Sequence, residues 1–231
     1  PMGTEDFYSE QLLRLPHAFC FTPDGAMRTS TVAERPADAP VTFGVLQNFI
    51  KINEESLKLW GRILKKLPKA QLILQDATVD SPLRVTTVLE MIEYLKLPAK
   101  RIFVRTGKRD YLADYGDIDI ALDTFPYTGG ASTATALYMG VPVITLRGET
   151  HHASRLGATM LTTAGHADWI AEDAHSYERL AVQMAEEIAT VRANRAALRA
   201  DVEASALMDG ASYLRAFTDM IECLWAGDFV R

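Results

Sequence analysis

Short apolar runs alternate with amphipathic stretches between residues 41 and 145. Runs typical of buried strands lie at 41–47, 71–75, 101–105, 118–122 and 141–145. The stretches between them predict helices at 54–67, 81–95, 108–115 and 132–139. Strands of near-continuous apolar character that alternate with helices predict a parallel sheet covered on both faces. The predicted fold class is therefore α/β, a Rossmann-like doubly wound parallel sheet.

Capping residues mark several of these helix ends. Asn53 is placed to cap the helix 54–67, and Pro82 stands at the first turn of the helix 81–95. Gly140 is placed to end the helix that precedes the fifth strand. These local signals agree with the hydrophobic pattern.

The pattern becomes helical after residue 150. Helices are expected at 154–161, near Asp168 and at 177–190, while 192–203 alternates charged residues with alanine and is predicted to be a solvated face. Asp209 is placed to cap a last helix that runs through Trp225. That helix has more apolar positions than a surface stripe needs, so it is expected to pack on another part of the protein.

Residues 1–40 differ from the remainder. The stretch 8–21 has enough apolar residues to pack against another part of the protein. The stretch 22–40 is rich in Pro, Ala, Asp and Thr and is predicted to be a linker. The predicted division is 1–40 as a joining segment and linker, 41–208 as the Rossmann-like lobe, and 209–231 as a C-terminal helix. Because the chain begins at Pro1, we expect it to be a piece of a longer protein.

Composition narrows the functional classes. The net charge of −6 argues against general binding to nucleic acid or to an anionic membrane. The two cysteines, Cys20 and Cys223, form neither a disulfide framework nor a metal signature and suit a reducing compartment, so a cytoplasmic location is expected. No apolar run approaches the roughly 18 residues that span a bilayer.

The turn after the fourth strand carries the main candidate chemistry. Gly129 and Gly130 are followed by Ala131, Ser132 and Thr133 at the start of a helix, where bare N–H groups and the helix dipole favour a phosphate. The spacing matches neither the dinucleotide fingerprint nor the P-loop. From the spacing alone, a tight turn with a capped helix is an equally good interpretation.

Topology brings a second segment to this turn. In such sheets ligands bind beyond the carboxyl ends of the strands, where strand order reverses. The loop after the first strand, with Asn48 and Lys51, is therefore expected beside Gly129–Thr133. A loop lysine alone is usually just solvated, but at this position Lys51 would neutralise a diphosphate and stabilise charge on a departing phosphate.

Other polar residues give weaker indications of a functional role. Lys108 is better interpreted as a surface cation, and Asp123 as the cap of the following turn rather than a catalytic base. Glu149, His151 and His152 match no standard metal-ligand spacing, so they are expected to be polar residues of the ligand rim and no metal site is predicted.

Several segments resemble a known family. They are FGVLQNFIKIN, LWGRILKKLP, QLILQ, ADYGDIDIALDTFPYTGGAST and LYMGVPVITLRGE. Together they resemble the C-terminal catalytic lobe of O-linked N-acetylglucosamine transferases, including their bacterial relatives and the plant SPINDLY type. FYSEQLLRLPHAF resembles the segment that joins the two lobes of these enzymes, so the resemblance extends from Tyr8 to about Trp225.

This resemblance implies a GT-B glycosyltransferase with two Rossmann-like lobes, TPR repeats ahead of them and the nucleotide sugar between them. It implies that Lys51 contacts the diphosphate and is needed for activity, that Asn48 lies near the same group, and that Lys108 lies by the uracil and ribose. It also implies that the turn Gly129–Thr133 binds phosphates, that no metal is required, and that the last helix packs back on the N-terminal lobe.

The sequence departs from the family pattern at the ribose end. Thr135 stands where a carboxylate normally holds the ribose hydroxyls, and the loss of such a bond costs roughly 1.5–3 kcal/mol. Tyr111 stands where many members have His, and the loop GETHHASR is one residue longer than usual. These changes leave open another nucleotide, another sugar, weaker binding or a degenerate lobe.

Three functions fit these observations. The first is the donor-binding lobe of an inverting transferase that moves a sugar, N-acetylglucosamine, from UDP to a protein hydroxyl, with a protein acceptor and an N-terminal lobe as partners. The second is a non-catalytic scaffold of the same fold. The third is a sugar-nucleotide epimerase, against which the lack of an acidic ribose pair near the C-terminal helix counts.

Overall fold

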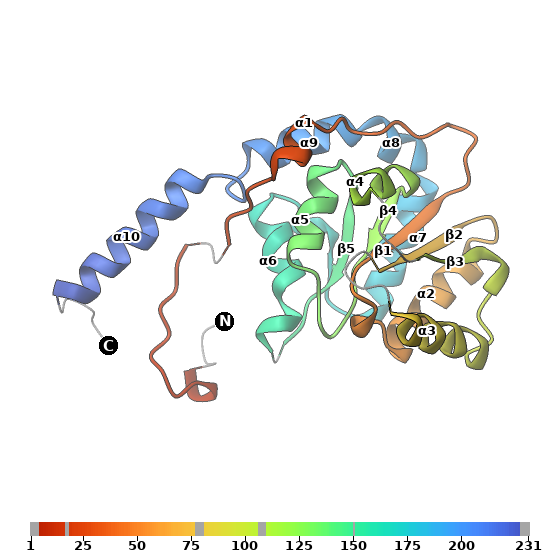
Figure 1. Cartoon of the computed structure of the whole chain (residues 1–231), viewed down its shortest axis with the longest axis horizontal. Coiled ribbons are helices and arrows are strands. Elements are labelled where there is room, and N and C mark those ends of the chain that lie inside the picture. Colours follow the sequence, from red (N-terminus) through yellow and green to blue (C-terminus); the bar gives the residue numbers. More distant parts are fainter. Residues whose placement is uncertain (1–4, 17–18, 77–80, 106–109, 150, 227–231) are drawn as a thin grey trace.

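The structure, a computed structural model, is organised around one six-stranded parallel sheet with the order β3-β2-β1-β4-β5-β6 (Figure 1). It describes residues 5–16, 19–76, 81–105, 110–149 and 151–226. The strands are β1 (Thr42–Leu46), β2 (Gln71–Gln75), β3 (Ile102–Arg105), β4 (Ile120–Leu122), β5 (Val143–Leu146) and β6 (Ile170–Ala171). The five predicted strands are confirmed, whereas β6 was not predicted because two residues form no recognisable pattern.

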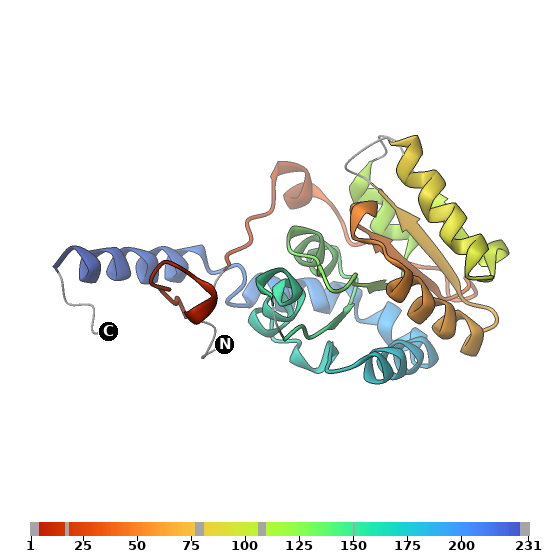
Figure 2. The ribbon, with the colours of Figure 1, turned by 90° about the horizontal axis from the view of Figure 1, so that it is seen from below.

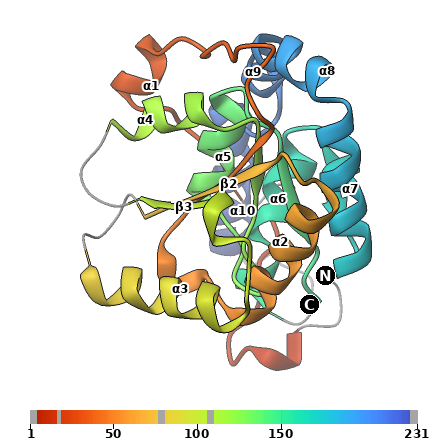
Figure 3. The same ribbon diagram turned by 90° about the vertical axis from the view of Figure 1, so that its right-hand side faces the viewer.

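Helices cover both faces of this sheet (Figure 3), which confirms the predicted fold class. The α-helices are α1 (Gly25–Thr29), α2 (Glu54–Lys66), α3 (Pro82–Tyr94), α4 (Tyr111–Asp114), α5 (Ala131–Tyr138), α6 (Leu156–Thr163), α7 (Ala174–Glu186), α8 (Ile188–Ala193), α9 (Arg195–Ala204) and α10 (Gly210–Ala226). Short 3₁₀ turns are η1 (Glu5–Phe7), η2 (Phe49–Lys51), η3 (Ala99–Arg101), η4 (Tyr115–Asp117), η5 (His152–Ser154) and η6 (Ala167–Trp169).

Two apolar cores fill the space between sheet and helices. On one face Phe43 and Val45 of β1 pack with Leu57 and Trp60 of α2 and with residues of α3 and α7. On the other face, residues of α4, α5, α6 and α9 share a core with Ile118. Gly44 of β1 faces this second core, where an added Cβ would lie 2.6 Å from Ile118 Cγ2. The alternation along β1 thus assigns one core to each face.

Three predicted helix ends are confirmed. Asn53 Oδ1 accepts a hydrogen bond from the Ser56 N–H at 2.9 Å, which caps α2. Gly140 follows Met139, the C-cap of α5, and has φ +73°, a left-handed conformation that favours glycine. Asp209 Oδ1 accepts from the Ser212 N–H at 2.9 Å and caps α10.

The region after β6 differs from the prediction in two respects. The helix expected at 177–190 begins at Ala174, because Asp173 caps it, and ends at Glu186 before α8 begins. The expected solvated face at 192–203 is wrong, since α9 buries Arg195, Leu198 and Val202. The two terminal nitrogens of the Arg195 guanidinium donate to backbone oxygens, at 2.7 Å to Ile118 and 2.9 Å to Tyr115, while its buried Nε has no partner among the described residues. A charge pattern alone does not reveal such an arginine.

The segment predicted as a linker lies along the lobe. Just ahead of it, the Phe21 N–H donates to the Leu207 carbonyl at 2.8 Å. Within it, Met27 is buried in the second core, and the Ser30 carbonyl accepts from Arg199 at 3.0 Å. By contrast, α10 extends away from the sheet and buries none of its residues (Figure 2). None of the described helices has the length and apolarity that crossing a bilayer would need.

A buried carboxylate joins this segment to the lobe. Asp119, fully buried before β4, accepts from the Arg192 Nε at 2.8 Å, the Arg35 Nε at 3.2 Å and the Thr42 N–H at 2.9 Å. Arg192 also donates to the carbonyls of Pro36 and Ala39, at 2.8 Å and 2.9 Å. Through these contacts the Asp119 carboxylate holds together α8, residues 35–40 and the start of β1.

We expect this carboxylate to make stability depend on pH. Burial alone raises the pKa of Asp119, but the hydrogen bonds from Arg192 and Thr42 and the charge of Arg35 outweigh it, so the net pKa lies below 3.8. A lowered carboxyl pKa stabilises the fold above the unfolded pKa, and that contribution is lost as pH falls through the folded pKa. In urea titrations, the stability difference between wild type and Asp119→Asn should shrink as pH falls from 5 to 3. A constant difference would contradict this assignment.

Candidate functional site

Strand order reverses between β1 and β4, which are neighbours in the sheet although α2, β2, α3, β3 and α4 lie between them in sequence. The chain leaves β1 toward Lys51 and leaves β4 toward the glycine turn, both at the carboxyl edge of the sheet. In doubly wound sheets this is where a crevice for ligands forms. The two loops that the sequence pointed to are therefore next to each other.

Lys51 reaches across to the glycine turn. Its Nζ donates to the Thr128 carbonyl oxygen at 3.0 Å and lies 4.1 Å from the centre of the Tyr127 ring. The side chain is half-buried; burial lowers the pKa of Lys51, and the negative charge of Asp123 acts in the opposite direction. A partly desolvated ammonium group held at the turn is suited to an anionic ligand.

The helix that follows the turn begins without a side-chain cap. Gly130 stands at the N-cap position of α5 and has no side chain to accept from the first N–H groups of the helix. The N–H groups of Ala131, Ser132 and Thr133 lie in the first turn and have no intrahelical partner. Together with the positive end of the helix dipole, these N–H groups form a row of donors. The row lies a few residues after Thr128, whose carbonyl Lys51 contacts.

Gly129 shapes the turn rather than offering a donor. Its N–H is occupied, because it donates to Asp123 Oδ1 at 2.7 Å. An added Cβ would lie 2.8 Å from the Ser132 Oγ and 3.0 Å from the Gln47 Nε2, so a side chain here would displace the start of α5. The donors available to a ligand are thus those of the helix start.

Asp123 is the centre of the network that holds this turn, which confirms its predicted capping role. The Gln47 Nε2 donates to its Oδ1 at 2.6 Å, and the Thr145 hydroxyl donates to its Oδ2 at 2.7 Å. Burial raises the pKa of Asp123, and these hydrogen bonds together with Lys51 oppose that rise. Tyr177 of α7 donates to the Asp123 carbonyl at 2.9 Å. Sequence reasoning missed Gln47, Thr145 and Tyr177, since nothing in their local pattern marks them.

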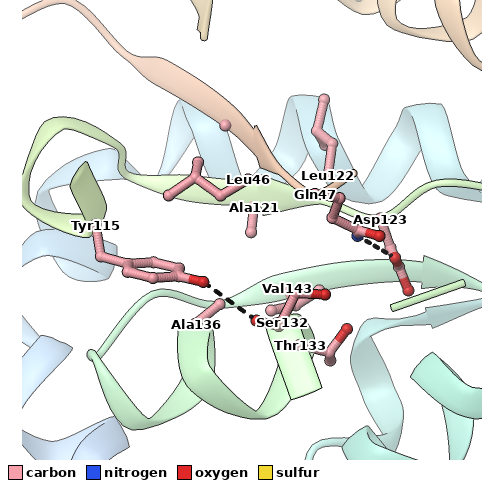
Figure 4. A pocket seen from close by; sticks show the side chains of 11 residues that line it. Leu46, Gln47, Tyr115, Ala121, Leu122, Asp123, Ser132, Thr133, Ala136 and Val143 are labelled. Atoms are coloured by element: carbon pink, nitrogen blue, oxygen red, sulfur yellow. Dashed lines mark hydrogen bonds between the residues drawn. The ribbon is translucent and has the colours of Figure 1, made fainter. Parts of the chain in front are cut away.

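A small cavity lies between the ends of β1 and β4 and the start of α5 (Figure 4). Its volume is about 10 Å³, room for about one water molecule. Tyr115 closes one side and donates to the Ser132 carbonyl at 3.5 Å, and burial raises its pKa well above the usual range. The buried Thr133 hydroxyl has no partner among the described residues. The first turn of α5 is therefore closely packed against the sheet.

Asn48, predicted near the diphosphate, and the predicted ribose-end residues Tyr111 and Thr135 have hydrogen-bond partners within the chain. The Asn48 Oδ1 caps η2 through the Ile50 N–H at 3.0 Å and accepts from the Arg84 Nη1 at 2.8 Å. The Tyr111 hydroxyl donates to Asp24 at 2.9 Å. Thr135 is buried, and its hydroxyl donates to the Ala131 carbonyl at 2.8 Å. Lys108 lies outside the described residues.

Residues 151–155 lie against the turn. The Thr128 N–H and hydroxyl both donate to the Ala153 carbonyl at 3.0 Å, and the Gly157 N–H donates back to the Thr128 Oγ1 at 3.0 Å. His151 and His152 of this segment are both exposed. The described residues contain no group of three or more His, Cys, Asp or Glu that could hold a metal ion.

A protein-family model covers most of this chain. The sequence model of the family described as Glycosyl transferase family 41 matches residues 22–217. The chain belongs to glycosyl transferase family 41. Among family relatives, a tomato protein named "Probable UDP-N-acetylglucosamine--peptide N-acetylglucosaminyltransferase SPINDLY" is 32% identical over 97% of this chain and 24% of its own length. This chain thus spans about a quarter of that curated relative.

Solved structures agree with the family 41 assignment. A mutant of the Thermobaculum terrenum O-GlcNAc transferase superposes with a TM-score of 0.79 and 29% identity, over 95% of this chain and 43% of that one. The pneumococcal O-GlcNAc transferase GtfA, in complex with UDP and GlcNAc, superposes with a TM-score of 0.53 and 14% identity, over 80% and 36% of the two chains. At that identity the second match concerns the fold alone, which is that of GT-B glycosyltransferases.

Proposed function

We propose that this chain is the donor-binding lobe of an inverting glycosyltransferase that moves N-acetylglucosamine from UDP to a serine or threonine hydroxyl of a protein. The observation that carries the proposal is the contact of the Lys51 ammonium with Thr128, beside the uncapped start of α5. An ammonium group and backbone N–H groups that meet at the glycine turn match the charge and geometry of a diphosphate. The donor and acceptor follow the printed name of the tomato relative.

Each residue has a defined part in this proposal. The N–H groups of Ala131, Ser132 and Thr133 bind phosphate oxygens, and Asp123 fixes the turn that presents them. Lys51 leaves the Thr128 carbonyl for the diphosphate. As the bond between the sugar C1 and the phosphate oxygen breaks, the electron pair goes to UDP, and Lys51 stabilises that charge. The acceptor oxygen bonds to C1 from the opposite face, and its proton passes to a base outside this lobe.

The other parts of the protein belong to the same proposal. In this proposal the acceptor binds to an N-terminal lobe outside this chain, which also supplies the base. TPR repeats precede that lobe, and the whole protein is cytoplasmic. The exposed apolar side chains of α10, such as Leu214, Phe217 and Ile221, are suited to pack against that lobe. Charge on the departing diphosphate is balanced by Lys51 and the α5 dipole, so transfer is expected without a divalent metal.

Calorimetric titration with UDP tests this function. We expect saturable binding of UDP and no binding of uridine over the same concentration range, because Lys51 and the glycine turn recognise the diphosphate. If uridine binds as tightly as UDP, or if neither UDP nor its sugars binds at millimolar concentration, the donor-site assignment is wrong.

Replacing Thr135 by aspartate tests the ribose end. A carboxylate at this position would accept hydrogen bonds from the ribose hydroxyls, worth roughly 1.5–3 kcal/mol, so UDP should bind about tenfold more tightly. Thr135→Asn is the uncharged control and should gain less. An unchanged UDP affinity in a folded Thr135→Asp variant would show that the ribose lies elsewhere.

A second candidate function, a non-catalytic scaffold, is favoured by one observation. Thr135, Asn48 and Tyr111 already have hydrogen-bond partners within the chain. A scaffold would bind no nucleotide, and Thr135→Asp would not create binding. The two titrations above therefore separate the scaffold from a transferase.

A further inference from the structure

A second depression lies at the opposite end of the sheet. Its volume is about 410 Å³, within the range of about 300–1,000 Å³ that is typical of ligand pockets. Pro142 lines it directly ahead of β5, so it opens at the amino ends of the strands, away from the glycine turn. Residues of α8 and α9 border it at that end.

The break between α7 and α8 helps to form this depression. A continuous helix was expected through residue 190, but Glu187 leaves the helical conformation with φ −93° and ψ 24°. Met184, before the break, and Leu198, from α9, form part of an apolar floor. The opposite wall comes from the segment between α6 and β6.

Two stacked rings form that wall. The His166 and Trp169 rings are nearly parallel, with an angle of 8° and centroids 4.1 Å apart. Burial lowers the pKa of His166, against the charges of Asp168 and Asp201, so the imidazole is neutral at neutral pH. Its buried Nε2 has no hydrogen-bond partner among the described residues. The wall is thus aromatic and adds no positive charge.

The charged residues of the rim are acidic. Glu187 and Asp201 both line the depression and are exposed. Neither forms an ion pair with a described lysine or arginine, and no lysine or arginine lines the depression. The Glu187 Oε1 accepts a hydrogen bond from the Gln183 Nε2 at 3.4 Å, a neutral partner. An apolar floor, an aromatic wall and two carboxylates without a cationic partner among the described residues together favour a cation with an apolar stem.

We propose that this depression is a binding site for an organic cation on a short alkyl stem, a guanidinium or ammonium group of the size of an arginine side chain. The stem lies on Met184 and Leu198, beside Trp169. The cationic group lies between Glu187 and Asp201. The proposal does not depend on the nucleotide site, because none of these residues takes part in it.

The test is an NMR titration of the whole chain that follows the Trp169 indole N–H, assigned with Trp169→Phe. N-acetyl-arginine amide, a model of a polypeptide side chain, and agmatine, a model of a free small cation, are the probes. At least one probe should produce a saturable shift, and the tighter one identifies the source of the cation. N-acetyl-citrulline amide has the same shape without the charge and should produce no saturable shift.

Variants complete the test. Glu187→Gln combined with Asp201→Asn should weaken binding at least tenfold. Glu186→Gln combined with Asp219→Asn removes the same charge from exposed positions outside the depression and should leave the affinity unchanged. The proposal is overturned if neither cation binds, if citrulline amide binds equally well, or if both double variants have the same effect.

Discussion

Lys51→Ala is expected to weaken UDP binding at least tenfold and to reduce sugar transfer by the full-length protein about 100- to 1,000-fold. Loss of a charge-assisted contact to phosphate costs roughly 1.5–3 kcal/mol in binding. The larger effect on transfer arises because removal of one group that stabilises developing charge costs about 10²–10³ in rate. Calorimetry with UDP and initial-rate assays measure the two effects.

Matched variants make this result specific. Lys65→Ala removes an exposed lysine near the end of α2 and should change neither quantity. Lys51→Arg keeps the charge, so it should retain more UDP affinity than Lys51→Ala. Because Lys51 packs on Tyr127 and one carbonyl only, the alanine variant should remain folded. Equal UDP affinity in the folded alanine variant and wild type would show that Lys51 does not contact the nucleotide.

Asp119→Ala is expected to destabilise the fold by about 3–5 kcal/mol, because it leaves the largely buried Arg192 and Arg35 without their carboxylate. The free energy of unfolding from urea titration at pH 7 measures this loss. Asp117→Ala is the control, since its ion pair with Arg105 is partly exposed and should contribute about 0–1 kcal/mol. Similar losses in both variants would contradict the central role of Asp119.

Most of the sheet could be predicted because its strands carry their own signal. The prediction for 71–75 has the same bounds as β2, and the caps at Asn53 and Asp209 follow from single residues with a known local geometry. What escaped prediction depends on residues distant in sequence. The two-residue β6 exists through its pairing with β5, and Arg195 is buried where carbonyls near β4 accept from its two terminal nitrogens.

The site was predicted only in outline for the same reason. The proximity of Lys51 to the glycine turn follows from strand order, and strand order follows from the α/β pattern. Gln47, by contrast, lies 76 positions from its partner Asp123 in the sequence. The hydrogen bond from the Gly129 N–H to Asp123, which makes this N–H unavailable to a ligand, could not be predicted from the sequence either. The roles of Ala131, Ser132 and Thr133 stay predictions.

The most direct measurement of the central claim is a crystal structure of the chain with UDP. We expect the diphosphate at the start of α5, with phosphate oxygens within hydrogen-bond distance of the N–H groups of Ala131–Thr133 and the Lys51 ammonium turned from Thr128 to the phosphates. A UDP molecule bound elsewhere, with Lys51 still bonded to Thr128, would contradict the account.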